Sequence, residues 1–430
     1  MEKNMQLFRD WNVLIAEMEG CATVSRWSGE SAQVIVESLF IKLTYKQAGG
    51  WWSRLALILA YLFLGNVSGF ASGDNPHPGR PQRGYTYMRD VVSEVPWSIH
   101  VLKVDRARAD LSFHTVVGQN PILGMATVPD QVKSLPPALG RAIAAINGDF
   151  YKNTRTYPGD PEGLQIMEGE LVSAPNPTRV CFWIDCNGAP HRSNVVSQFQ
   201  VTLPDGTSLP FTLNEERNGN AVLYTGAIGE STRTSGGVEL ILESTGKGSW
   251  LPLKPGETYE ARVRMVNPDG NSPVKRDTMV LSMNSDLSQH VSVVRPGSIL
   301  KMTTATIPDL KGVTTAIGGG PTLVVGGKAR TWSGSQPRQP RTALGWNKDY
   351  LFLVVVDGRQ REISVGMTFP ELANYMVKLG CEDAMNLDGG GSATFWIYGN
   401  VVNSPSEGKE RAAANALVLI QRETKTGTTK

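Results

Sequence analysis

Apolar and polar residues alternate along much of the chain after residue 96, with the two-residue period of strands that bury one face. Trp97–Val104 carries this pattern, and Ala142–Ile146 is an apolar stretch of strand length. Leu351–Val356 is apolar throughout, which predicts a central strand buried on both faces. Gly326-Gly327 and Gly399-Asn400 each separate two such runs, and these dipeptides predict two-residue hairpin turns.

One helix stands out against this background of strands. Thr368 followed by Glu371 predicts a capping box, and Gly380 suits the left-handed end of a helix. Between them, apolar residues recur with helical spacing at Leu372, Tyr375, Met376 and Leu379. A short helix among many strands predicts an α+β fold, in which β-rich mixed sheets with hairpins carry a few flanking helices.

The segment Val195–Leu300 is polar, strand-like and rich in turn motifs such as NPDGNSP. Two interpretations remain open at this point. The segment either forms a β subdomain or makes long excursions from the main sheet.

Leu55–Leu64 is a run of ten apolar residues directly after Arg54, and small residues follow as far as Ala71. This is the pattern of a secretory signal. A membrane-spanning helix needs about 20 apolar residues, and Asn66 and Ser68 interrupt the run, so a cleaved signal is favoured over an anchor or a buried helix. We therefore expect an exported protein, in the periplasm, at the cell surface or outside the cell, with membrane contact only through an uncleaved signal.

These observations divide the chain into five parts. Residues 1–53 are an extension of uncertain status and 54–71 the signal. Residues 72–95 are a linker rich in Pro, Gly and Arg, 96–422 one folded domain and 423–430 a polar tail.

The charge balance bears on the class of partner, and the cysteine content bears on disulfides. The chain of 430 residues has 42 Lys and Arg against 40 Asp and Glu, so we expect no nucleic-acid partner. Four cysteines are too few for a disulfide scaffold in a chain of this length. Cys181 and Cys186 are close enough in sequence for a local disulfide in an oxidising compartment, but the sequence decides neither this nor the oligomeric state.

Four segments carry glycines and polar residues where apolar strands end, and we take them as candidate site segments. They are AAINGDFY with Asn147 and Asp149, AIGGGPTLV with Gly319 and Gly320, RTALGW to DGRQ with Arg341, Thr342, Asp357 and Arg359, and AMNLDGGGSATFW with Asn386, Asp388, Gly389, Gly390, Gly391 and Ser392. The last segment is the most informative, because the side chains of Asn386 and Asp388 share one strand face. The glycines that follow offer a run of exposed backbone N–H groups beside them.

Other site chemistries fit these segments poorly. The glycine spacing is not that of a dinucleotide fingerprint, since a strand rather than a helix follows. Ser392 lacks the nucleophile-elbow pattern of a hydrolase, and none of the five histidines lies in these motifs. No His pair or run of carboxylates indicates a metal centre, so we expect no cofactor, although the sequence leaves a supporting divalent cation open.

Taken in order, the motifs resemble those of the phosphodiester glycosidase family. The resemblance extends from about Val101 to Ile420 and rests on INGDFY, LYTGAIGESTRTSGGVELIL, IGGGPTLV, RTALGW, VVVDGRQ, SVGMTFPELA, MNLDGGGSATFW and NSPSEGKERAAANAL. The resemblance implies one continuous catalytic domain that hydrolyses a sugar-1-phosphodiester, with N-acetylglucosamine or a related glycan as the expected sugar. Asp149 stands where relatives often have a second glycine, and Ala412 follows Arg411 where the family pattern often has proline.

The implied substrate suggests roles for these residues. Phosphate is a good leaving group, so such a site needs a cation for the phosphate and a carboxylate facing the oxocarbenium-like carbon. The expected catalytic residues are Asp388, Asp357, Glu410 and Arg341. The expected substrate-binding residues are Asn147, Asp149, Gly319, Gly320, Thr342, Arg359, Asn386, Gly389, Gly390, Gly391, Ser392 and Arg411.

Two alternatives stay open at the level of sequence. The same residues could hold a carbohydrate or sugar phosphate without cleaving it, as in a surface binding protein. They could also process a polymeric exopolysaccharide. In each case a glycan or sugar phosphodiester is the expected partner, and the sequence specifies neither the natural sugar, nor the aglycone, nor retention or inversion of the anomer.

Overall fold

The computed structural model describes residues 83–248 and 250–422, which belong to one compact unit built mainly of strands. Within this part of the chain the α-helices are α4 (Val128–Lys133) and α5 (Phe369–Lys378). The expected β-rich sheets with hairpins and few helices are confirmed. The α+β class overstates the helix content, because hairpins and loops make most connections between strands. The fold is mostly β.

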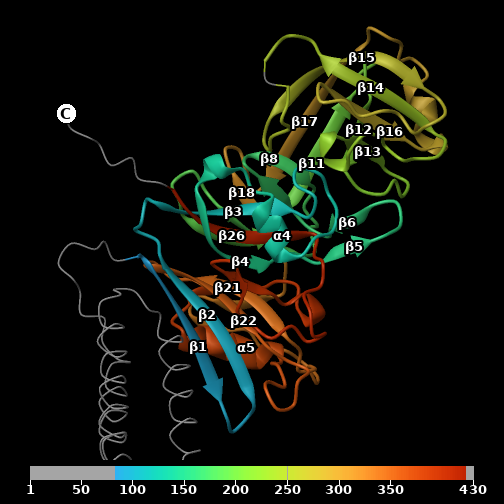
Figure 1. The fold of residues 1–430 in the computed structure, drawn as a ribbon. Coiled ribbons are helices and arrows are strands. Elements are labelled where there is room, and N and C mark those ends of the chain that lie inside the picture. The colour runs from blue at the N-terminus through green and yellow to red at the C-terminus, as the bar shows by residue number, and fades with distance from the viewer. Residues whose placement is uncertain (1–82, 249, 423–430) are drawn as a thin grey trace, which may run out of the picture. The chain divides into compact units, whose positions relative to one another are not determined.

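The large sheet has seven strands, all paired antiparallel, in the order β1-β2-β22-β21-β23-β19-β20 (Figure 1). Their bounds are β1 Tyr85–Val92, β2 Trp97–Asp105, β22 Tyr350–Val356, β21 Arg341–Trp346, β23 Asp383–Asn386, β19 Thr322–Val325 and β20 Lys328–Ala329. In β22, Leu353 and Val355 face one apolar core while Phe352 and Val354 face another. The predicted strand buried on both faces is therefore confirmed.

The predicted linker ends earlier than expected. Residues 85–92 pair along their whole length with β2 and form the edge strand of the large sheet. The prediction of a linker over 72–95 is wrong for these residues, because their backbone pairs with β2 and leaves the other edge of the strand without a neighbour in the sheet.

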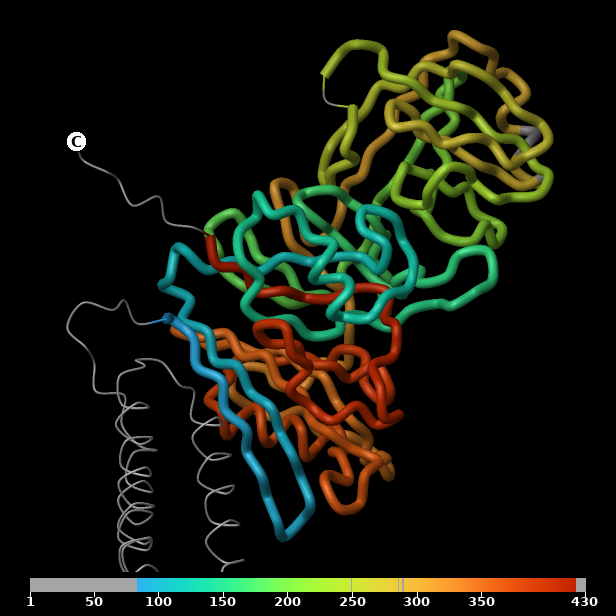
Figure 2. The backbone as a smooth tube through the Cα atoms, in the orientation of Figure 1, coloured from blue at the N-terminus to red at the C-terminus, as the bar shows by residue number. Residues whose placement is uncertain are grey.

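Two further sheets pack around the large sheet. One has the order β25-β24-β4-β26-β3, and its strand β26 runs between β3 and β4, from the other end of the chain (Figure 2). Its strands are β25 Asn400–Val401, β24 Phe395–Ile397, β4 Arg141–Asn147, β26 Asn415–Gln421 and β3 Leu111–Val117. Its apolar residues share a core with one face of the large sheet, and α5 covers the other face.

The other sheet has the order β10-β9-β18-β7-β8, and a short hairpin, β5-β6, leads into it. Its strands are β10 Pro190–Asn194, β9 Val180–Ile184, β18 Thr315–Gly318, β7 Gln165–Met167 and β8 Glu170–Ser173, and the hairpin is β5 Tyr151–Asn153 with β6 Pro158–Pro161.

The segment that the sequence left undecided forms a closed barrel with the order β11-β12-β13-β16-β14-β15-β17 (Figure 1). Its strands are β11 Val196–Thr202, β12 Ser208–Leu213, β13 Ala221–Tyr224, β14 Val238–Ser244, β15 Thr258–Asn267, β16 Thr278–Met283 and β17 Ile299–Ile307. Barrel residues such as Phe199 share one apolar core with Ile166 and Trp183 of the neighbouring sheet. The barrel is thus a β subdomain whose core continues into the rest of the fold.

The local turn and cap predictions can be compared residue by residue. Thr368 caps α5 and forms the predicted capping box with Glu371. The Gly326-Gly327 turn is confirmed by pairing of Val325 with Lys328. The second turn is shifted by one residue, because Ile397 pairs with Asn400 and the turn residues are Tyr398-Gly399, both with positive φ.

Several expectations concern other parts of the chain. The extension, the signal and the polar tail lie outside the described residues. Among the residues that are described, no helix is long and apolar enough to cross a membrane. Cys181 is buried and Cys186 exposed, and both are free thiols.

We predict that Thr368→Ala lowers the free energy of unfolding by about 1 kcal/mol, because the first turn of α5 loses its side-chain cap. Urea denaturation of the full chain checks this value. Thr331→Ala, at an exposed position outside any helix, is the matched control and should change stability by less than about 0.5 kcal/mol. Equal effects of the two substitutions would contradict the role given to the cap.

Candidate active site

The site forms where β4 ends and the glycine loop after β23 begins, and Asn147 joins the two. Its Nδ2 donates to the carbonyl oxygen of Asp388 at 2.7 Å. Its Oδ1 accepts from Thr342 Oγ1 at 2.7 Å and from the backbone N–H of Thr394 at 3.1 Å. Asp388 N–H in turn donates to the carbonyl oxygen of Gly148 at 2.9 Å. Asn147 and Thr342 therefore position the site segments, since their side chains are used inside the protein.

Asp149 is a buried carboxyl with one oxygen left over. Oδ1 accepts from Phe150 N–H at 2.8 Å and from the Arg179 guanidinium at 3.4 Å. Oδ2 is buried and has no hydrogen-bond partner among the described residues. Burial raises the pKa of Asp149 to about 7, against the smaller opposing effect of Arg179. At neutral pH this carboxyl is poised between its acid and its base form.

The glycine segment after β18 leaves room for this carboxyl. A Cβ on Gly318 would collide with Asp149 Oδ2. The backbone N–H of Gly319 donates to Val180 O at 3.0 Å and that of Gly320 to Asn386 O at 2.7 Å. These two amides, which the sequence suggested for substrate, are used within the fold, so the segment serves close packing instead.

Arg179, a residue that sequence reasoning missed, completes this side of the site. Its guanidinium contacts Asp149, lies 3.1 Å from Glu162 Oε2 and sits over the Phe150 ring, 4.3 Å from its centroid. The only signal in the sequence was a charged residue directly before an apolar strand, which is common at strand ends. Its proximity to Asp149 arises from tertiary structure.

Asp388 is the second carboxyl of the site. Its Oδ1 accepts from the backbone N–H of Gly389 at 2.8 Å. Burial raises its pKa, while the Ser392 hydroxyl, Gly389 N–H and Arg411 act in the opposite direction. Glu162 raises the pKa of both Asp388 and Asp149, so the two carboxyls experience the same neighbouring charge.

The three glycines after Asp388 bring two arginines close to the loop. A Cβ on Gly390 would lie 3.0 Å from the Arg359 guanidinium, and one on Gly391 would collide with that of Arg411. Arg411 is paired with Glu407 through both of its carboxylate oxygens, and Arg359 Nε donates to Gln339 Oε1 at 2.7 Å. The loop is thus covered by positive charge, of which only part is neutralised.

Arg341 lies on the face of the large sheet that α5 covers. Its Nε and Nη2 donate to the carbonyl oxygens of Met367 and Pro337 at 2.8 and 2.9 Å, and its guanidinium covers the Phe369 ring at 4.0 Å. It makes no ion pair within the described residues. Burial, together with Arg359, lowers its pKa to about 10, so its charge remains at neutral pH and is not compensated by a carboxylate.

Asp357, an expected catalytic residue, is held inside the fold. Oδ2 lies 2.9 Å from His100 Nε2, and Oδ1 accepts from Ser404 N–H at 2.7 Å and from Asn403 Nδ2 at 3.2 Å. Both oxygens are occupied and the side chain is 1% exposed. These contacts form a structural hydrogen-bond network and disfavour the catalytic role that the sequence suggested.

Three of the predicted residues remain to be placed. Asn386 Nδ2 donates to the carbonyl oxygens of Gly320 and Leu387, and its buried Oδ1 has no partner in the described residues. The Ser392 hydroxyl is buried and has no partner of regular hydrogen-bond geometry there, although it is near enough to Asp388 to lower the pKa of that carboxyl. Glu410 is half-buried and forms no hydrogen bond or ion pair within the described segments, so its catalytic role stays a prediction.

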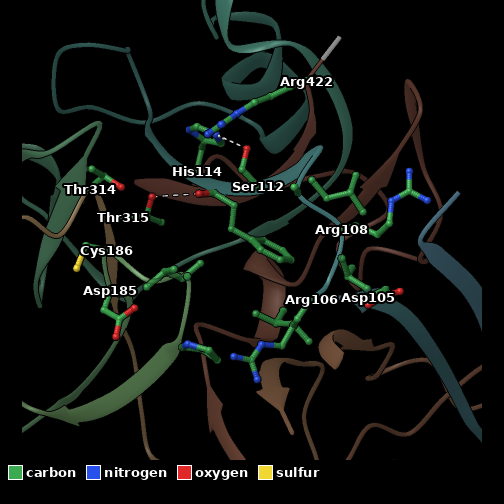
Figure 3. A pocket seen from close by; sticks show the side chains of 18 of the residues that line it. Asp105, Arg106, Arg108, Ser112, His114, Asp185, Cys186, Thr314, Thr315 and Arg422 are labelled. Atoms are coloured by element: carbon green, nitrogen blue, oxygen red, sulfur yellow. Dashed lines mark hydrogen bonds between the residues drawn. The ribbon is translucent and has the colours of Figure 1, made fainter. Parts of the chain in front are cut away.

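Two cavities differ in their relation to this site. One of about 420 Å³ is lined by Phe150, Arg179, Gly319 and Gly320, and so adjoins Asp149. The other, of about 510 Å³, is lined by Arg106, His114, Asp185 and Arg422 among others and by none of the predicted site residues (Figure 3). No group of three metal-ligating side chains occurs in the part of the chain that the structure describes.

We predict that Asp149→Asn raises the free energy of unfolding more at pH 8 than at pH 5. The native carboxyl keeps its proton to about pH 7, whereas the unfolded one releases it near 3.8, so the wild type loses stability as pH rises between these values. The amide does not titrate, and the difference between the two proteins should grow by on the order of a few kcal/mol across this range. Urea denaturation at several pH values measures it.

The control for this series is Asp269→Asn, at an exposed turn position. It should leave the pH dependence of wild type unchanged. Parallel pH curves for wild type and Asp149→Asn would contradict the raised pKa.

We predict that Asp357→Asn lowers the free energy of unfolding by about 1–3 kcal/mol while activity per folded molecule changes less than about threefold. The amide has one acceptor oxygen, whereas the carboxylate faces His100 with one oxygen and accepts from Ser404 N–H and Asn403 Nδ2 with the other. His100→Gln should show the same loss of stability. A fall in kcat of a hundredfold or more at unchanged stability would instead restore the catalytic assignment of Asp357.

Comparison with known proteins relates part of this chain to one family. The family model for phosphodiester glycosidase matches residues 255–420. The SPbeta prophage-derived uncharacterized protein YomE of Bacillus subtilis is 36% identical over 90 residues, which cover 21% of this chain and 14% of that protein. N-acetylglucosamine-1-phosphodiester alpha-N-acetylglucosaminidase of Bos taurus is 40% identical over 68 residues, 16% of this chain and 12% of that enzyme. The chain thus matches only about one seventh of the length of these relatives.

Solved structures show the same fold at low sequence identity. A hypothetical protein from Synechocystis matches with a TM-score of 0.64 and 18% identity, over 80% of this chain and 64% of the other. A protein from Burkholderia pseudomallei described as exported matches with a TM-score of 0.58 and 22% identity, over 76% and 74%. The matched region contains Asp388, Arg341 and the glycine loop, and the family model confirms over residues 255–420 the resemblance to the phosphodiester glycosidase family that the motifs indicated.

Proposed function

We propose that this protein hydrolyses the glycosidic bond of a sugar-1-phosphodiester, with N-acetylglucosamine as the sugar. The observation that carries the proposal is a pair of carboxyls with raised pKa values, the buried Asp149 and the partly buried Asp388, whose segments are joined by the backbone hydrogen bond from Asp388 N–H to Gly148 O. Arginines flank both of them. The match of residues 255–420 to the phosphodiester glycosidase model supports the reaction class, and the bovine relative, which is named for this sugar, supports the choice of sugar.

The chemistry follows from the leaving group. The bond between the anomeric carbon and the phosphate oxygen breaks, and a phosphate monoester departs with the electron pair while water supplies the new oxygen at the carbon. Asp388, as a carboxylate, stabilises the positive charge that develops on the sugar ring. Arg179, beside Asp149, and Arg411, beside Asp388, offset the negative charge of the departing phosphate.

Asp149 serves as the acid and base of this scheme. With a pKa raised to about 7, it is mostly protonated below neutral pH and can donate to the departing phosphate oxygen. Its buried Oδ2, which has no partner in the described residues, is the oxygen free to exchange that proton. It can then accept a proton from the attacking water.

Export is part of the same proposal. The apolar run Leu55–Leu64 after Arg54 supports it, as does the fold shared with a protein that is described as exported. A secreted or periplasmic enzyme of this kind would meet glycans and sugar phosphodiesters outside the cytoplasm.

The test is to incubate the full-length protein with the methyl diester of N-acetylglucosamine α-1-phosphate in ¹⁸O-labelled water. We expect free N-acetylglucosamine with the label on the sugar, together with unlabelled methyl phosphate. Asp388→Asn should lower kcat by at least about a hundredfold while the protein keeps its circular dichroism spectrum and melting temperature.

Other products would overturn the assignment. Sugar phosphate with methanol, and label on phosphate, would make the protein a phosphodiesterase. Tight binding of the diester without turnover would favour the carbohydrate-binding alternative. A folded and fully active Asp388→Asn variant would remove Asp388 from the mechanism.

A further inference from the structure

The cavity of about 420 Å³ is lined by Arg179, which the proposed reaction uses, and by residues that the catalytic scheme does not use. Among these are Asn194, Gly320, Phe369 and Arg330. Its volume is within the range of pockets that hold small molecules.

The charged side chains that line this cavity are positive. Arg179 and Arg330 line the cavity, and none of its lining side chains is acidic. Arg341 adds a further cation behind the Phe369 ring. Since glutamate and aspartate are missing from the lining, the cavity favours an anion over a neutral or cationic group.

The two arginines that line the cavity differ in how far nearby acids neutralise their charge. Arg179 already contacts Asp149 and Glu162. Arg330 is exposed and forms no ion pair or side-chain hydrogen bond within the described residues, and its backbone N–H is fixed by Leu323 O at 2.8 Å. The guanidinium of Arg330, whose backbone is fixed while no acid pairs with its side chain, is therefore available to a ligand in the cavity.

We propose that this cavity is the aglycone subsite and that Arg330 selects an aglycone carrying a second phosphate group. The inference rests on the proposed function, in which the scissile phosphodiester lies by Arg179. A single phosphodiester leaves the charge of Arg330 without a partner, whereas a second phosphate on the aglycone would occupy the Arg330 end of the cavity. Arginine meets phosphate oxygens with two parallel N–H groups, which gives this contact its selectivity.

The experiment compares two diesters of N-acetylglucosamine α-1-phosphate, one with glycerol and one with glycerol 3-phosphate. Binding is measured by titration calorimetry in the full-length Asp388→Asn variant, so that neither diester is consumed. We expect the phosphorylated aglycone to bind about tenfold more tightly at low ionic strength. Adding Arg330→Gln should reduce the ratio of the two affinities to about one.

Arg264→Gln in the same background is the matched control. Arg264 is an exposed arginine of β15 in the barrel, outside the cavity lining, and the variant should keep the tenfold ratio. Equal binding of the two diesters before any arginine is changed would overturn the inference. So would an Arg330→Gln variant that keeps the full ratio, or an Arg264→Gln variant that loses it.

Turnover by the wild type separates this inference from the proposed function. If the wild type cleaves neither diester but the ratio of affinities depends on Arg330, the subsite is supported and the hydrolase assignment fails. If both diesters are cleaved and bind equally, the hydrolase assignment is supported and the subsite is rejected.

Discussion

The geometry of the site depends on the side-chain amide of Asn147. Its three hydrogen bonds join β4, the large sheet through Thr342 and the glycine loop at Asp388 and Thr394. The residue is fully buried, so each bond replaces contacts with water that the folded protein cannot offer. Without this amide, the backbone hydrogen bond from Asp388 N–H to Gly148 O would remain, but the links from β4 to Thr342 and Thr394 and to the carbonyl oxygen of Asp388 would be lost.

Around that amide, the fold buries carboxyl groups that would be more stable in water. Asp149 and Asp388 have raised pKa values because burial disfavours their charge more strongly than nearby donors and arginines favour it. Asp357, which is equally buried, has both oxygens filled by His100, Asn403 and Ser404. The difference separates a carboxyl that can exchange a proton with a ligand from one that holds strands together.

The arginines near the site also divide into those that are paired with an acid and those that are not. Arg411 and Arg179 are paired with acids, while Arg341 and Arg330 have no ion pair among the described residues. The unpaired arginines lie toward one side, on Phe369 and along the cavity. Positive charge without a paired acid is therefore found at the cavity, where it favours an anion over a neutral or cationic group.

The sequence by itself determined the strands, the capped helix and the glycine-rich segments. These depend on local spacing and turn chemistry, and Leu351–Val356 and Thr368 with Glu371 carried that information without reference to the rest of the chain. It also marked Asp388, because an acid before three glycines is unusual in a strand. It could not separate Asp357 from Asp388, since both follow apolar strands and precede glycine.

Tertiary structure decided the rest. The closure of Val196–Ile307 into a barrel depends on strand partners that are distant in sequence. The contact of Arg179 with Asp149 spans 30 residues and that of His100 with Asp357 spans 257. The burial, hydrogen-bond partners and pKa of a side chain depend on such contacts, because its neighbours across the sheets are distant in sequence. The sequence showed which chemical groups are present, and only the packing of the sheets decided which of them have no partner inside the protein.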